Sequence, residues 1–140
     1  MAGYSGKPLA DKLGVKPGIE MALLHAPEGF PNALGPLPPD VRIRKAASPT
    51  ASIVLLFVRE ERVLSKELPR IATTLPPGGM LWVAWPKKAS RQPTDLTEDV
   101  VRRVGLDAGI VDVKVCAIDD VWSGLKFLRR RVPASRPSSA

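Results

Sequence analysis

The chain has 140 residues, of which 44% are hydrophobic and 25% charged, as is typical of one globular domain with a single core. It contains no run of about 18 apolar residues that could cross a bilayer, and its N-terminus lacks the apolar segment of a signal peptide. These features exclude an integral membrane protein and predict a cytoplasmic one. A single cysteine, Cys116, excludes an internal disulfide, and its alternating surroundings predict a small buried residue.

The net charge of +7 and the isoelectric point of about 10.0 raise the question of nucleic-acid binding. Four of these charges belong to arginines in the last twelve residues, which leaves +3 on residues 1–128. The basic residues are Arg129, Arg130, Arg131 and Arg136. Residues 132–140 are rich in proline and serine, which predicts a disordered tail after a domain of residues 1–131. Nucleic-acid association through this tail is one hypothesis for function.

The first part of the chain predicts three strands, at residues 19–24, 41–44 and 53–58. The second is short and alternating, which indicates a position near an edge of the sheet. The third is almost continuously apolar, as in a strand that is buried on both faces of a parallel sheet. Short helices are expected at residues 9–13 and 32–37.

The second part predicts two helices and three strands. Apolar residues at helical spacing predict a helix over residues 60–75, with a kink or a break at Pro69. A buried strand at residues 80–85 leads through a polar loop to a helix that starts at a capping box of Asp95 and Glu98 or at Thr94. That helix should end at Gly105 or Gly109. Strands at residues 111–118 and 122–128 should form an antiparallel pair.

This order of elements predicts an α/β fold: a Rossmann-like, doubly wound, mostly parallel sheet with a C-terminal antiparallel hairpin, in three αβα layers. Trp82 and Trp85 lie three positions apart on one strand, so they should enter the core from opposite faces of the sheet. Trp122 is expected at an edge or at a self-association surface.

The phrase Leu75-Pro-Pro-Gly-Gly-Met-Leu-Trp82, together with the closing hairpin, resembles a shortened S-adenosylmethionine-dependent methyltransferase domain. A closer resemblance, over about residues 4–131, is to a small bacterial family called domain of unknown function 3052. The segments that carry it are Pro8–Gly14, Ala26–Phe30, Gly78–Ser90, Thr94–Arg102 and Trp122–Phe127. The second resemblance implies kinship without an established activity.

The methyltransferase resemblance implies a glycine-rich turn after the first strand and an acidic residue at the end of the second. The chain has instead His25-Ala-Pro-Glu-Gly-Phe30 in the first turn, and Arg42-Ile-Arg-Lys45 at the second strand end. Glu28 is a substitute for one ribose contact or an ordinary turn residue. S-adenosylmethionine therefore remains a less favoured cofactor hypothesis.

Open α/β sheets bind ligands at the carboxyl ends of their strands. The loops after the first, third and fourth strands should therefore converge in a crevice. The candidate ligand-binding residues are His25, Glu28, Gly29, Arg59, Lys87, Lys88, Ser90 and Thr94.

Lys87 and Lys88 either anchor a small anion or form ion pairs with the acidic first turn of the next helix. His25 is a candidate general base, although a structural role is favoured for a histidine without an identified carboxylate partner. One histidine and one cysteine cannot supply an ordinary zinc site.

No catalytic constellation is evident in the sequence. The favoured function is a non-catalytic module that binds a small anionic ligand or a protein partner. The alternative is a degenerate or unconventional S-adenosylmethionine-dependent methyltransferase.

Overall fold

The computed structural model describes residues 8–129 as a six-stranded sheet with helices on both faces. The strand order is β2-β1-β3-β4-β6-β5, with the first four strands parallel and β6 antiparallel to both β4 and β5. The predicted Rossmann-like class is therefore confirmed. The strands are β1 (Glu20–Leu24), β2 (Arg42–Arg44), β3 (Ala51–Phe57), β4 (Met80–Pro86), β5 (Ile110–Ala117) and β6 (Trp122–Arg129). The helices are α1 (Leu9–Leu13), α2 (Phe30–Ala33), α3 (Glu61–Thr74), the short 3-10 helix η1 (Lys88–Ser90) and α4 (Glu98–Asp107).

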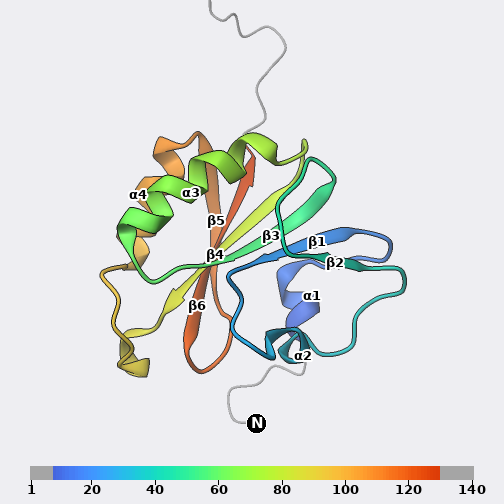
Figure 1. Ribbon diagram of the computed structural model, residues 1–140, viewed down its shortest axis with the longest axis horizontal. Coiled ribbons are helices and arrows are strands. Elements are labelled where there is room, and N and C mark those ends of the chain that lie inside the picture. The colour runs from blue at the N-terminus through green and yellow to red at the C-terminus, as the bar shows by residue number, and fades with distance from the viewer. Residues whose placement is uncertain (1–7, 130–140) are drawn as a thin grey trace, which may run out of the picture.

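The sheet separates two hydrophobic clusters, which gives the three predicted layers (Figure 1). The long helices α3 and α4 cover one face, and the short helices α1 and α2 cover the other. β3 is buried along nearly its whole length, as its continuous apolar sequence predicts, while β2 is an exposed edge strand.

The two tryptophans of β4 enter opposite clusters, as predicted. Trp82 is fully buried and its indole Nε1 donates a hydrogen bond to the Leu13 carbonyl at 3.1 Å, which ties β4 to the end of α1. Trp85 packs in the cluster beneath α3 and α4. Trp122 differs from the prediction: it is buried at the start of β6, because β6 inserts between β4 and β5 rather than forming the sheet edge.

The helix α3 is not divided at Pro69, which occupies an exposed position inside it. Water can hydrate the carbonyl that loses its hydrogen-bond donor there, so the break that proline often causes is avoided. The short helix α2 begins at Phe30, two residues before the predicted start, directly after Gly29 with a φ of 79°. This is the left-handed region that glycine adopts readily.

The start of α4 also corrects a prediction. Its N-cap is Thr97, whose hydroxyl accepts a hydrogen bond from the Val100 N–H at 3.2 Å, whereas Asp95 and Thr94 make contacts to the start of α3 and to Arg59, just after β3, that are described below. The helix continues through Gly105 and ends just before Gly109, at a φ of 89°.

Cys116 is half-buried rather than buried, because β5 is an edge strand with an exposed middle. Arg129 closes β6, and its guanidinium donates to the Leu75 carbonyl. The proposed boundary after residue 131 and the Pro/Ser-rich tail of residues 132–140 lie outside the described residues. Among residues 8–129, no helix is both long and apolar enough to span a bilayer.

Candidate functional site

A cleft of about 680 Å³ opens at the carboxyl edge of the sheet, where β1 and β3 end. From β1 the chain runs to β2 on one side and then returns to β3 on the other, so the cleft lies at the topological switch point of the sheet. We call it the strand-end cleft. The described residues that line it are His25, Pro27, Phe57, Val58, Arg59, Glu60, Val63, Glu67, Pro93, Thr94, Asp95 and Trp122.

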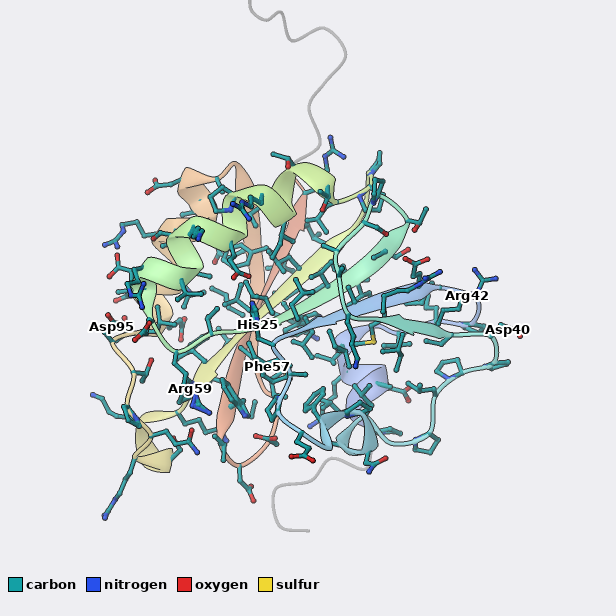
Figure 2. All side chains as sticks on the ribbon, viewed as in Figure 1. His25, Asp40, Arg42, Phe57, Arg59 and Asp95 are labelled. Carbon is teal, nitrogen blue, oxygen red and sulfur yellow. The ribbon has the colours of Figure 1, made fainter. Side chains whose placement is uncertain are left out.

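Aromatic rings form one wall of the strand-end cleft. Phe57 makes edge-to-face contacts with Phe30 at 4.8 Å and with Trp122 at 5.0 Å between ring centroids. The guanidinium carbon of Arg59 lies 5.1 Å from the centre of the Trp122 ring, in a cation–π contact. Figure 2 shows Phe57 and Arg59 beside His25 in this part of the molecule. A charged, flat group is thereby held against an apolar wall.

The connection between η1 and α4 is fastened to the start of α3. Asp95 accepts a hydrogen bond from the Glu61 N–H at 2.8 Å, and so caps a helix that has no capping side chain of its own. The Thr94 hydroxyl donates to the Arg59 carbonyl at 2.7 Å and accepts from the Leu96 N–H at 3.0 Å. These bonds bring residues 93–95 to the cleft, although Asp95 and Thr94 lie 34 and 35 positions after Glu61 and Arg59 in the sequence.

His25 contacts a carboxylate that the sequence did not identify. Its Nε2 lies 2.9 Å from Oε1 and 3.1 Å from Oε2 of Glu67, in the second turn of α3. His25 has a φ of 59°, a left-handed conformation that is uncommon for a residue with a side chain. The histidine side chain is 56% exposed and the glutamate 29%, so the pair lies at the surface of the cleft.

Carboxylates outnumber cations in the strand-end cleft. Among the described residues that line it, Glu60, Glu67 and Asp95 carry carboxylates, and Arg59 carries the one guanidinium. Glu60 also lies 3.2 Å from Arg62 in an exposed ion pair, and Asp95 uses one oxygen for its cap. No salt bridge between Arg59 and another described residue is present, so its donors remain available to a ligand.

The predicted crevice thus exists, with part of the predicted residue set. His25, Arg59 and Thr94 line it, whereas Glu28, Gly29, Lys87, Lys88 and Ser90 do not. Glu28 is exposed in the turn after β1, and Gly29 forms the N-cap of α2. The Ser90 hydroxyl donates to the Lys87 carbonyl at 2.6 Å and so stabilises η1 rather than extending into the cleft.

The ion pairs expected as the alternative role of Lys87 and Lys88 are not formed either. Within residues 8–129, no salt bridge joins Lys87 or Lys88 to the acidic residues before and within α4. Glu98 and Asp99 instead pair with Arg102, at 2.5 and 3.2 Å, and Arg102 also binds Asp112 of β5 at 2.9 Å. Hydrogen bonds to Glu98 and Asp112 raise the pKa of Arg102 above its ordinary value. This cluster fastens α4 to the sheet.

The described part of the chain contains no group of three or more histidine, cysteine, aspartate or glutamate side chains that could hold a metal ion. The groups that the cleft offers to a ligand are its carboxylates, Arg59, the aromatic wall and the His25–Glu67 pair.

No family model matches the chain and no curated protein matches it in sequence, so the resemblance to domain of unknown function 3052 stays a prediction. Solved structures do match. An S-adenosylmethionine-dependent methyltransferase from Aquifex aeolicus superposes with a TM-score of 0.63 at 15% identity, over 87% of this chain and 88% of that one.

Two further structures give similar alignments. A Bordetella parapertussis chain named as a possible exported protein has a TM-score of 0.62 at 12% identity, over 87% of this chain and 65% of that one. Magnesium protoporphyrin IX methyltransferase from Synechocystis PCC 6803, with bound SAH, has a TM-score of 0.53 at 11% identity, over 81% and 75% of the two chains. At these identities the likeness establishes the fold alone: the chain has the Rossmann-like fold of S-adenosylmethionine-dependent methyltransferases.

Proposed function

We propose that this protein is a non-catalytic module that binds a small nucleoside-containing metabolite in the strand-end cleft. The observation that carries this proposal is the combination, in one cleft, of a flat guanidinium held on an aromatic wall with several carboxylate acceptors. A nucleoside offers the matching groups: a planar base, and amine and hydroxyl donors.

The planar base would stack on Arg59. The guanidinium rests with one side toward the Trp122 ring, and a guanidinium plane accepts a second flat partner as aromatic rings do. Since Trp122 itself is only 5% exposed, Arg59 offers the larger accessible surface to a ligand.

The carboxylates would accept the hydrogen bonds of amine and hydroxyl groups. Glu60 is exposed at the N-cap of α3, and Asp95 has a second oxygen beyond the one that caps α3. Hydrogen bonds to charged acceptors are roughly twice as strong as those between neutral groups. A preference for donor-rich ligands follows, which revises the expectation that the ligand is anchored by Lys87 and Lys88.

The cleft contents favour binding over reaction. No serine or cysteine is among the described residues that line it, and the Thr94 hydroxyl already donates to a backbone carbonyl. The His25–Glu67 pair is the one acid–base arrangement there, and both side chains are solvent-accessible rather than held in the water-poor surroundings in which enzymes usually tune such groups.

S-adenosylmethionine is the second candidate ligand, with methyl transfer as the corresponding activity. The named fold neighbours favour it, because they include S-adenosylmethionine-dependent methyltransferases. The turn after β1 argues against it: it holds one glycine, Gly29, and a rigid proline, Pro27, where that cofactor's site has a glycine-rich turn. β2 ends without a carboxylate.

The test is calorimetric titration of the full chain with adenosine, S-adenosylmethionine and S-adenosylhomocysteine. We expect adenosine to bind and the Arg59→Ala variant to bind at least about tenfold more weakly, which corresponds to the loss of roughly 1.4 kcal/mol. Lys88→Ala is the matched control, because it removes an exposed cation outside the cleft, and its affinity should be unchanged. Absence of binding by all three ligands would refute the proposal, and exclusive binding of the two sulfur compounds would favour the methyltransferase alternative.

A further inference from the structure

A second hollow of about 320 Å³ lies on the other side of the His25–Glu67 pair, against α3. We call it the side pocket. It is formed by the end of β1, by the segment after β2 and by the middle of α3. The residues that line it are Leu24, His25, Lys45, Ala46, Ala47, Glu67, Arg70 and Ile71.

Only His25 and Glu67, among the described lining residues, belong to both the strand-end cleft and the side pocket. Their hydrogen bonds of 2.9 and 3.1 Å therefore form the partition between the two hollows. The pair is partly exposed, and exposed ion pairs add little stability. A ligand could separate the two side chains at small cost and so occupy a continuous space.

The two hollows differ in charge. The strand-end cleft has three carboxylates and one guanidinium, whereas the side pocket has two cations, Lys45 and Arg70. The one carboxylate among the described residues of the side pocket is Glu67, which His25 already engages. Within residues 8–129, neither Lys45 nor Arg70 forms a salt bridge, so both are available to an anionic group.

The backbone at His25 supports a functional role for the partition. His25 adopts a left-handed backbone conformation, with a φ of 59°, that glycine or asparagine would adopt with less strain. Strain of this kind tends to persist at sites where the side chain has a use. At this position the side chain reaches Glu67, 42 residues further along the chain.

We propose that the ligand of this protein is a nucleoside monophosphate, with its base and sugar in the strand-end cleft and its phosphate in the side pocket, between Lys45 and Arg70. Binding separates His25 from Glu67. The inference rests on the proposed function for the nucleoside part and adds the phosphate, because two cations that line one hollow without a salt bridge are suited to a dianion. The His25–Glu67 pair then favours ligands that can separate its two side chains.

The test compares adenosine with adenosine 5′-monophosphate, titrated into the full chain and into a Lys45→Ala/Arg70→Ala double variant. We expect the wild-type chain to bind the monophosphate at least about tenfold more tightly, and the double variant to bind the two ligands equally. A Lys87→Ala/Lys88→Ala double variant, which removes the same charge outside both hollows, should keep the preference. Circular dichroism would verify that each variant is folded.

A measurement on the wild-type chain makes the test independent of the variants. In two-dimensional ¹H–¹⁵N spectra, the monophosphate should shift the amide signals of residues 45–47 and 70 more than adenosine does. Equal affinity for both ligands, or a preference that survives in the Lys45/Arg70 variant, would overturn the phosphate site while leaving nucleoside binding intact. If neither ligand binds, both the proposed function and this inference fail.

Discussion

Gly105 in α4 offers a sharp test of the packing that holds the helix on the sheet. A Cβ added there would lie 2.1 Å from Cε1, 2.4 Å from Cζ and 2.8 Å from Cδ1 of Phe127, whereas carbon atoms in contact are normally about 3.5–4.0 Å apart. Phe127 is fully buried in β6, so its ring cannot turn toward solvent. Overpacking of this kind costs about 1–3 kcal/mol, and the higher helix propensity of alanine offsets about 1 kcal/mol. We therefore expect Gly105→Ala to destabilise the protein by up to about 2 kcal/mol.

The assay is urea unfolding, followed by circular dichroism, of the wild-type chain, Gly105→Ala, Phe127→Leu and the double variant. Phe127→Leu alone is destabilising, since it removes buried ring atoms. In the double variant, however, leucine leaves room for the new methyl group. The loss of stability measured for the double variant should therefore be smaller than the sum of the losses of the two single variants. If Gly105→Ala is as stable as the wild type, or the two changes are additive, the close approach of α4 to β6 is not what requires glycine.

Three further predictions concern other parts of the fold. Asp95→Ala should lower the free energy of unfolding by about 0.5–2 kcal/mol, because the Glu61 N–H loses its cap, whereas Asp95→Asn keeps an acceptor and should cost less; equal losses in urea titrations would contradict this. Lys126 has a pKa below its ordinary 10.5, first because it is partly buried and then because Lys114 lies opposite it in the hairpin. Just below pH 10.5 the unfolded chain therefore binds more protons than the folded one, so stability should rise with pH in that range. Lys114→Glu should add about 0.2–1 kcal/mol to the free energy of unfolding at pH 7 and should weaken the rise of stability with pH. If the variant and the wild type give the same unfolding curves at pH 7 and at pH 10, repulsion between Lys114 and Lys126 does not affect stability. Removing residues 130–140 should leave unfolding unchanged and abolish any salt-sensitive retention on immobilised DNA, so retention of DNA by the shortened chain would place a nucleic-acid surface on the described fold.

The sheet was accessible from the sequence because its strands are marked by their apolar character. β3 and β4 are buried on both faces, and continuous apolar runs of this kind identify central parallel strands without reference to any partner. The position of the cleft followed from the same reasoning, since parallel strands present their carboxyl ends at one edge. His25 and Arg59 were identified on this basis.

The details that the sequence did not reveal depend on contacts between distant segments. Asp95 has the sequence spacing of a cap for α4, yet its carboxylate caps α3, and only the folded chain brings the Glu61 N–H within 2.8 Å of it. Glu67 was missed for a similar reason: in the sequence of α3 it is one of several polar residues, and nothing local connects it with His25. Lys87 and Lys88 were chosen because they follow a strand directly, but η1 turns the chain there, and of the described loop between β4 and α4 it is residues 93–95 that line the cleft.

The hydrogen bonds of Thr94 and Asp95, which form the rim of the strand-end cleft, also indicate how a ligand would bind. Asp95 binds the start of α3, and Thr94 binds Arg59 in the connection between β3 and α3, so the aromatic wall and this rim are in place before any ligand arrives. A site formed in advance loses little conformational freedom on binding, which favours affinity over large rearrangement. The His25–Glu67 pair differs from this rim, because it is an exposed contact between side chains and its separation leaves the main-chain hydrogen bonds of α3 and β1 intact. Ligand selection should therefore be concentrated at this pair, and changes at His25 or Glu67 should alter which ligands bind more than they alter the stability of the fold.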